Sequence, residues 1–380
     1  MTEPIGRRIA LHRRRRGLSQ AAVAGLVGRS ESWLSQVERG LRTVDSYTVL
    51  RDLARVLRVD IGTLAGSGQA SEPERSPVRM DVVEIERTLL VGVAAEPVLD
   101  VASAVPELHA AYQAARYDEV LAALPGLIAA LDGQDAALIA RGYTVAAKTL
   151  TKIGSHDLAL VAADRAWAAA RRSGGPADVG MAVYQVVCAL LPTPRSALAE
   201  ELAATSAARL EDDADPAACS VAGALWLIAA VAAARRTDAA ASGERLNRAQ
   251  RLADHLGEDA NYRWTAFGPT NVAIHRVSVA VELGDAPGAL AAAEAVDVDQ
   301  LPEALRSRRV QVQLDVAWAH AQRRRDAEAL VALLEIERAA PQVTRRNAVA
   351  RDTIRQLLAR ARGSSGAAVR GLAHRAGVVV

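Results

Sequence analysis

The sequence predicts an all-α protein, with a small N-terminal domain of short helices followed by a long array of helix pairs. Hydrophobic residues make up 51% of the 380 residues, yet aromatic residues make up only 3%, and alanine dominates the apolar set. This composition favours helices packed through small side chains over β-structure, which is enriched in aromatic and β-branched residues. From about residue 81 onward, segments with helical spacing alternate with turns rich in Gly, Pro and Asp, and no segment shows strand-like alternation.

Residues 1–65 are expected to form the N-terminal domain, and its helices follow from their start and stop signals. The first helix runs from Ile5 to Arg16 and ends at the glycine that follows. Ser19 can cap the second helix, Gln20 to Val27, because its hydroxyl can accept a hydrogen bond from a free N–H group of the first turn. Gly28 can adopt the left-handed conformation that ends a helix.

Three further helices complete this domain. Ser30 can cap the third helix, and Gly40 stops it. The fourth helix, Val44 to Leu57, has apolar residues at core spacing, and a fifth runs from Ile61 to Leu64. The domain is therefore expected to contain five helices.

The second and third helices and the turn between them have the spacing of a helix-turn-helix motif. The stretch GLSQAAVAGLVGRSESWLSQVERG resembles the Cro/C1-type helix-turn-helix of the XRE family, with its SQ-x2-hydrophobic-A opening and its S-x-hydrophobic-E-x-G close. The resemblance covers residues 5–65. It implies that the third helix enters the major groove of DNA, and that Arg13 in the first helix pairs with Glu38 near the end of the third.

The third helix has only two obvious core residues, Leu34 and Val37, so its polar face is expected to be its working surface. Gln can pair with adenine, Arg with guanine and Glu with cytosine, whereas Ser tolerates several base edges. We expect the bases to be read by Arg29, Glu31, Ser32, Ser35 and Gln36. Phosphate contacts, which set the register, are expected from Gln20, Arg39, Arg42 and Thr43. Trp33 could clamp a sugar-phosphate or pack on the second helix.

Charge is distributed unevenly along the chain. The whole chain carries +2, but residues 1–65 hold twelve arginines and six acidic residues, a net charge of +6, which leaves −4 for the rest. A basic domain with a polar helix favours double-stranded DNA as the partner over a purely structural role for the motif.

Residues 66–80 are expected to be a flexible linker, because GSGQASEPERSP is rich in Gly, Ser, Pro and charge. Residues 81–380 then contain about six helix pairs and a final stretch, 344–377, that would cap the array. The turns of the pairs lie within 115–124, 150–170, 190–202, 232–250, 281–295 and 319–337. One such pair cannot bury its own apolar face, so a stacked solenoid follows. The spacing resembles degenerate tetratricopeptide (TPR) repeats.

TPR arrays expose the first helix of each pair on a concave wall, and polar or aromatic residues recur on the corresponding segments. The expected groove for a peptide or a small amphipathic ligand is lined by Arg141, Lys148, Trp226, Asn271, His275, Ser278, Gln311, Asp315 and Trp318. Two alternatives stay open. The two tryptophans could fill gaps between small residues, and the segment 260–277, whose FGPTNV resembles a segment of actinobacterial helix-turn-helix/TPR regulators, could be a turn and a helix cap.

No arrangement of residues points to an enzyme, a cofactor or a metal site. HExxH, Walker A and GxSxG motifs are missing from the sequence, and none of the seven histidines has metal-ligand spacing. Cys188 and Cys219 lie alone in apolar segments, which fits a reducing cytoplasm. The N-terminus lacks the apolar core of a signal peptide, and the longest apolar run, Val221 to Ala234, is expected to be a buried helix rather than a membrane span. We therefore expect a cytoplasmic, nucleoid-associated protein without a membrane partner.

A DNA-binding domain followed by a TPR-like array resembles the RRNPP-type regulators. The resemblance implies a dimer whose solenoid binds a signalling peptide and alters the spacing of its two DNA-binding heads. The leading hypothesis is a homodimeric transcriptional regulator that reads an inverted repeat and is controlled by an effector, either a peptide or a small molecule. A second hypothesis makes the array a scaffold that docks a partner protein, and a third gives the helix-turn-helix a role in assembly only.

Overall fold

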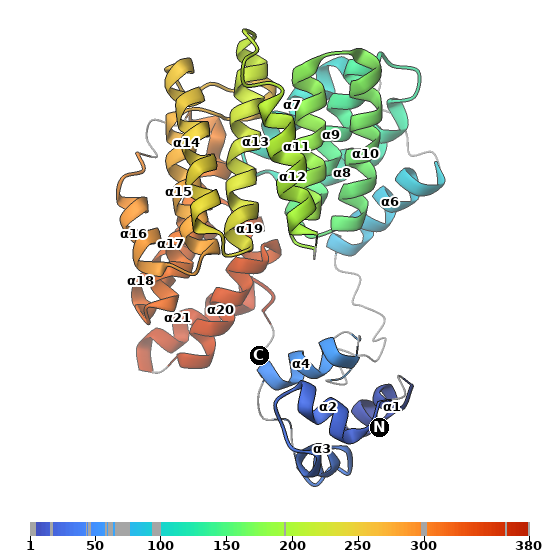
Figure 1. Ribbon diagram of the computed structural model, residues 1–380, viewed down its shortest axis with the longest axis vertical. Helices are drawn as coiled ribbons and strands as arrows, with labels where there is room; N and C mark the ends of the chain where they lie inside the picture. Colours follow the sequence, from blue (N-terminus) through green and yellow to red (C-terminus); the bar gives the residue numbers. More distant parts are fainter. Residues whose placement is uncertain are drawn as a thin grey trace. The chain divides into compact units, whose positions relative to one another are not determined.

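The computed structural model describes residues 5–15, 18–42, 44, 47–57, 59, 64, 77–92, 100–193, 195–297, 302–361 and 363–378. All regular secondary structure within these ranges is helical, so the all-α prediction is confirmed (Figure 1). The chain divides into two compact units, residues 1–80 and residues 81–380.

The helices described in the first unit share one apolar core. They are α1 (Ile5–Arg15), α2 (Gln20–Leu26), α3 (Glu31–Glu38) and α4 (Tyr47–Leu57). Ile9, Leu34 and Leu53 are fully buried in a single cluster that joins α1, α3 and α4. Of the predicted fifth helix only Leu64 lies within the described residues, and it is buried in the same cluster.

The ends of α2 and α3 follow the predicted signals. The hydroxyl of Ser19 accepts a hydrogen bond of 3.0 Å from the N–H of Ala22, and that of Ser30 accepts one of 3.2 Å from the N–H of Trp33. Gly28 and Gly40, which follow the two helices, have φ values of 65° and 74°, a region that favours glycine. Local sequence therefore sets the length and the direction of α3.

The second unit is a succession of helices, and short turns join the two helices of each described pair. Its helices are α6 (Pro77–Val91), α7 (Val101–Gln113), α8 (Tyr117–Ala130), α9 (Ala136–Lys152), α10 (His156–Ser173), α11 (Pro176–Leu190), α12 (Ser196–Ala208), α13 (Pro216–Arg235), α14 (Ala239–Leu256), α15 (Pro269–Glu282), α16 (Ala286–Glu294), α17 (Arg306–Gln322), α18 (Asp326–Ala339), α19 (Pro341–Arg346), α20 (Ala348–Arg360) and α21 (Gly363–Arg375), with the short 3₁₀ helices η1 (Tyr262–Trp264) and η3 (Glu303–Leu305).

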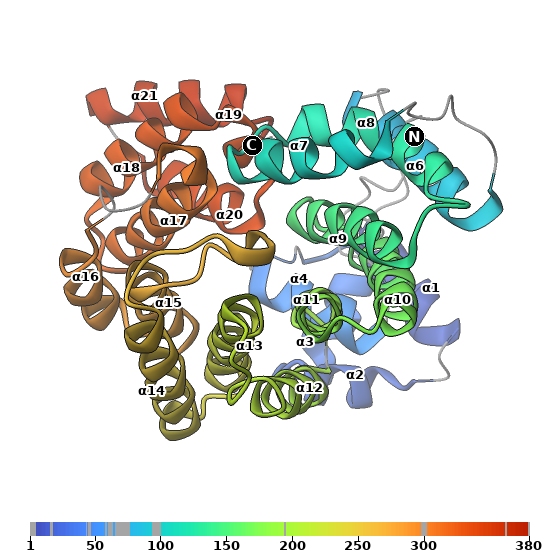
Figure 2. The same ribbon diagram turned by 90° about the horizontal axis from the view of Figure 1, so that it is seen from above.

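These helices stack as the six pairs that the sequence predicts, from α7 with α8 to α17 with α18. The first helices of successive pairs, α7, α9, α11, α13, α15 and α17, contact one another in that order and line the inner side, as Figure 2 shows. α17 also contacts α7, so the sixth pair returns to the first. α20 and α21 pack at the end of the array, where a cap was expected.

Five turns between paired helices share one backbone arrangement. Each has one residue with a left-handed φ between 56° and 84°, and the residue after it donates its N–H to the carbonyl five positions back, over 2.9 or 3.0 Å. This is the 6→1 hydrogen bond of the Schellman motif, which satisfies a free carbonyl at a helix end. The left-handed residues are Ala115, Gly154, Thr237, Gly284 and Arg324. Because only two of them are glycine, the repeat leaves a weak trace in the sequence.

α13 is the most apolar part of the unit. By length and composition it could cross a membrane, but the apolar stretch is completely buried among its neighbours. Its Ala, Val and Leu side chains pack in one cluster with residues of α11, α12 and α14. The prediction of a buried helix over Val221 to Ala234 is therefore confirmed.

Candidate functional site

An ion pair with a third polar partner fixes the first three helices of the N-terminal unit. Nε and Nη2 of Arg13 donate to Oε1 and Oε2 of Glu38 over 2.6 and 2.8 Å, and the amide of Gln20 donates to Oε2 over 2.7 Å. Burial raises the pKa of the Glu38 carboxyl, but these hydrogen bonds and the charge of Arg13 lower it by a larger amount. The pKa of Glu38 therefore lies below its usual value. The pair that the family resemblance implied is thus formed, and it ties α1 and α2 to the end of α3.

The surface of α3 presents polar side chains. Arg29, Glu31 and Ser32 are exposed, whereas Ser35 and Gln36 are half-buried. Trp33 is 9% exposed and packs in the core with Leu34 and Val37. Of the two roles considered for this tryptophan, the structure therefore supports packing. Arg29 lies 5.8 Å from the centre of the Trp33 ring, where a cation is attracted by the aromatic face.

The expected phosphate contacts differ in their surroundings. Arg39 and Arg42 are exposed after the end of α3, and Thr43 lies outside the described residues. Gln20 is half-buried, and its amide already donates to Glu38. A phosphate contact by Gln20 would therefore compete with its bond inside the domain.

A second candidate site lies on the inner side of the helical array, where a cavity of about 120 Å³ opens between α7, α9, α11 and α17. Residues 263–265, which precede α15, form one wall. The side chains that line the cavity are His109, Tyr112, Gln113, Thr144, Lys148, Thr151, Lys152, Met181, Tyr184, Gln185, Cys188, Ala224, Arg263, Trp264, Thr265, Ser307, Arg308 and Gln311.

Among the described residues, the lining of this cavity carries positive charge and no carboxylate. Lys148, Lys152, Arg263 and Arg308 contribute side chains to it. Burial, reinforced by the charge of Arg308, lowers the pKa of Lys148 well below its usual value and that of Lys152 to about 8. The two lysines are the only ones in the chain.

Lys148 is held by groups that do not neutralise it. Its Nζ lies 2.5 Å from Nδ1 of His109 and 4.4 Å from the centre of the Tyr112 ring. Burial, together with the charge of Lys148, lowers the pKa of His109 well below its usual value. The imidazole is therefore neutral, accepts from Lys148 at Nδ1, and has Nε2 3.3 Å from the carbonyl of Arg141.

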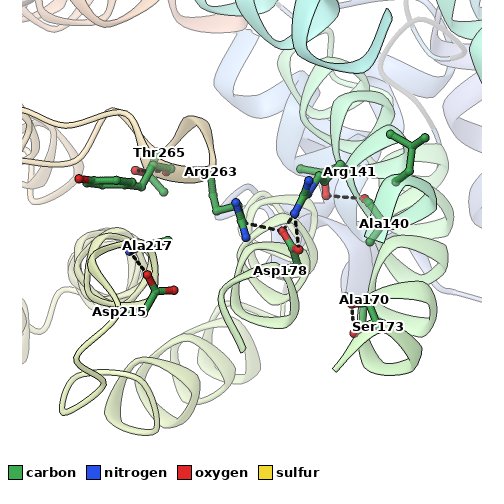
Figure 3. A network of polar contacts seen from close by, with 12 residues as sticks. Ala140, Arg141, Ala170, Ser173, Asp178, Asp215, Ala217, Arg263 and Thr265 are labelled. Carbon is green, nitrogen blue, oxygen red and sulfur yellow. Dashed lines mark hydrogen bonds and ion pairs between the residues drawn. The ribbon is translucent and has the colours of Figure 1, made fainter. Parts of the chain in front are cut away.

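The segment before α15 reaches across the inner side to α7 and α11. The ring of Trp264 stacks on that of His109 with 3.7 Å between the centres, and Asn261 and Gln113 exchange two amide hydrogen bonds of 2.9 and 3.0 Å. Arg263 and Arg141 converge on Asp178 of α11 (Figure 3), with nitrogen to oxygen distances of 2.8 and 3.0 Å. Arg263 and Trp264 have left-handed φ values of 51° and 58°, a strained conformation that these contacts must hold.

Several expected groove residues form buried polar contacts beside the cavity. Asp315 accepts hydrogen bonds of 2.7 Å from Ser278 and 3.1 Å from Gln311, and burial raises its pKa to about 7. His275 contacts the carbonyl of Asn271 through Nδ1 over 2.8 Å, and burial together with the charge of Arg308 lowers its pKa to about 3. Oδ1 of Asn271 is buried and has no hydrogen-bond partner within the described residues.

Comparison with known proteins bears on the first unit. Residues 4–65 match the family model described as a helix-turn-helix domain. These residues are a helix-turn-helix domain. A search of curated proteins gave no match. Among solved structures, the chain is similar to Bacillus thuringiensis PlcR in complex with the peptide PapR7 and DNA, at 13% identity and a TM-score of 0.37, over 85% of this chain and 98% of that one. At these values the likeness carries no weight for function.

The structure corrects part of the groove expected outside the helix-turn-helix domain. Lys148 and Gln311 line the cavity, and Arg141 borders it through its pair with Asp178. Asn271, His275, Ser278 and Asp315 are not among the lining residues but lie in the helices around it. Trp226 is buried, donates to Glu211 over 2.9 Å and lies under Arg248, whereas Trp318 packs between α15, α16 and α17. Both tryptophans therefore fill gaps between small residues.

Sequence reasoning missed most of the cavity. Tyr112, Tyr184 and Arg308 carried no local signal, because each lies in an ordinary helical pattern. Lys152 could have been found, since it is one of only two lysines and stands one helical turn after Lys148. The segment 260–277 was singled out correctly as unusual, and its first part forms a wall of the cavity.

Proposed function

We propose that the protein is a sequence-specific transcriptional regulator whose helical array binds an effector and thereby controls operator binding. The helix-turn-helix domain supplies DNA binding, and the exposed polar face of α3 is the observation that supports sequence reading. We further propose that Arg29, Glu31, Ser32, Ser35 and Gln36 read bases, and that Gln20, Arg39, Arg42 and Thr43 contact phosphates.

The effector is proposed on the evidence of the cavity. Ligand sites in proteins are concave, combine apolar and aromatic walls with a few polar groups, and often contain residues with shifted pKa values. The cavity has this character, with Tyr112, Tyr184 and Trp264 beside Lys148 and Lys152. It also lies between the first and the sixth helix pairs, so a ligand there could favour one curvature of the array over another.

We propose a homodimer that reads an inverted repeat, because a two-fold dimer presents two recognition helices to half-sites about one helical turn of DNA apart. In a cytoplasmic regulator of this kind, the effector would change the geometry of the dimer rather than α3 itself.

The test is a footprint of the purified protein on DNA upstream of its own gene, at about 150 mM salt, where non-specific binding is weak. We expect a protected inverted repeat that weakens or shifts when small-molecule extract of the producing cells is added. If the extract does not change the protection, the protein still binds a specific DNA sequence, and docking of a partner protein becomes the favoured role of the array. Weak binding to every sequence would refute the regulator.

A further inference from the structure

We propose that the cavity binds an anionic group, a carboxylate or a phosphate, carried by the effector. This inference rests on the proposed function for its biological meaning, but its chemistry can be tested without DNA. It follows from the balance of charge inside the second unit, from the donors that converge on the cavity, and from the size of the space.

The first step is that the cavity has cations without partners of opposite charge. Lys148, Lys152 and Arg308 form no ion pair within the described part of the chain. The polar groups that contact Lys148 and Arg308 are uncharged. Nζ of Lys148 contacts Nδ1 of His109, and Nη2 of Arg308 donates to the carbonyl of Thr265 over 3.2 Å. A buried cation without a counter-ion costs folding free energy, and well-packed apolar side chains at such sites are often more stable. Lys148 is buried, Lys152 and Arg308 are half-buried, and all three line one cavity. This gathering of basic side chains without carboxylate partners points to a role in binding.

The second step is that the nearby carboxylates are already engaged. Asp178 is shared by Arg141 and Arg263. Asp315, whose charge reaches Lys152, is held by Ser278 and Gln311, and its pKa of about 7 leaves it only partly ionised near neutral pH. Neither of these two described carboxylates is free to balance the charge of the cavity, which favours a charge supplied by a ligand.

The third step is the convergence of donors from separate elements. α9 contributes Lys148, Thr151 and Lys152, while α17 contributes Arg308. An arginine can donate two parallel hydrogen bonds to a carboxylate or a phosphate, and a lysine adds a point charge. This donor set suits a compact anionic group.

The fourth step is the space. About 120 Å³ is close to the roughly 150 Å³ of an engineered cavity that holds benzene. The aromatic rings of Tyr112, Tyr184 and Trp264 are part of its wall. A flat anion fits this combination, and benzoate is a suitable probe, because benzamide has nearly the same shape without the charge.

The experiment measures binding of benzoate, inorganic phosphate and benzamide to the full-length protein by calorimetry and by thermal shift. We expect benzoate or phosphate to bind and to raise the melting temperature, whereas benzamide does neither. Binding of benzoate alone would identify a carboxylate as the group, and binding of phosphate alone a phosphate. If benzamide binds as well as benzoate, or if neither anion binds, the proposal is wrong.

Arg308→Gln should weaken binding of the anion by about 10- to 150-fold, the equivalent of the roughly 1.5–3 kcal/mol of a hydrogen bond to a charged group. The matched control is Arg306→Gln, on the same helix, because Arg306 is exposed and does not line the cavity. Lys152→Gln provides a second variant if Arg308→Gln fails to fold. Equal weakening by Arg306→Gln would overturn the site.

The footprint separates this inference from the proposed function. If the anion binds and Arg308→Gln weakens its binding, but neither the extract nor the anion changes operator protection, the site stands and the effector role fails. If extract shifts the footprint equally for the wild type and Arg308→Gln, the effector role stands and the inference that the effector carries the anionic group is wrong.

Discussion

Two neighbouring residues near the end of α3 are expected to affect DNA binding in different ways. Gln36→Ala should relax the preference at one base pair, where it costs about 1–3 kcal/mol of discrimination, because only that base loses its partner. Arg39→Ala should weaken binding to all sequences alike and reduce the slope of log affinity against log salt by about 1. Titration of the operator and its single base-pair variants at several salt concentrations distinguishes them. A uniform loss for Gln36→Ala would contradict its role as a reader.

Lys152 should make the stability of the folded protein depend on pH. Its pKa of about 8 in the folded protein lies below the value near 10.4 of an unfolded chain. Below about pH 8 the lysine is charged in both states, and the cost of burying the charge is fully present. Between about pH 8 and pH 10 the unfolded chain binds more protons, so the contribution of Lys152 becomes less unfavourable as pH rises.

Lys152→Met tests this expectation by urea unfolding. The variant should be more stable than the wild type near pH 7, and the difference should shrink towards pH 10. Burial raises the pKa of the Cys188 thiol to about 12, so above about pH 9 this group lowers the stability of the folded protein as pH rises. Cys188 is present in both proteins, and its contribution cancels when their stabilities are compared. A difference that stays constant with pH would show that Lys152 keeps its ordinary pKa.

The turn shared by the helix pairs predicts opposite changes in stability for two substitutions. Gly154 has a φ of 84°, and a Cβ added there would meet no atom within 4 Å, so Gly154→Ala would suffer only from the strained backbone. It should lose about 1–2 kcal/mol of stability. Arg324 has a φ of 56° in the equivalent turn and is exposed, so Arg324→Gly should be stabilising by up to about 1 kcal/mol. Denaturant unfolding measures both, and a stabilising Gly154→Ala or a destabilising Arg324→Gly would refute the equivalence of the turns.

The individual helices were predictable where a local signal set their ends. Ser19 and Ser30 begin α2 and α3, and glycines follow them, because capping depends on residues close in sequence. Side-chain orientation was harder to predict in the array. α13 is apolar on all sides, so periodicity could not tell which neighbour Trp226 faces, and the structure places it against Arg248 rather than in the groove.

For the whole molecule, the cavity shows why the rest of the site could not be predicted. Lys148 and Arg308 are 160 residues apart in sequence and line the same cavity because α17 returns to α7. That return depends on the sum of small rotations between successive pairs, which no local pattern specifies. The conformation of the segment 261–265 could not be predicted either. Its left-handed residues are not glycines, and contacts with α7 and α11 hold them in that conformation.

The division into residues 1–80 and 81–380 leads to a prediction for the whole chain. Each unit has its own apolar clusters, so calorimetry should show two unfolding transitions. Arg13→Ala should lower only the transition of the helix-turn-helix domain, because it leaves the buried Glu38 without its main partner. Benzoate or phosphate should raise only the other, since a ligand stabilises the unit that holds it. A single transition that responds to both changes would instead mean that the two units unfold as one.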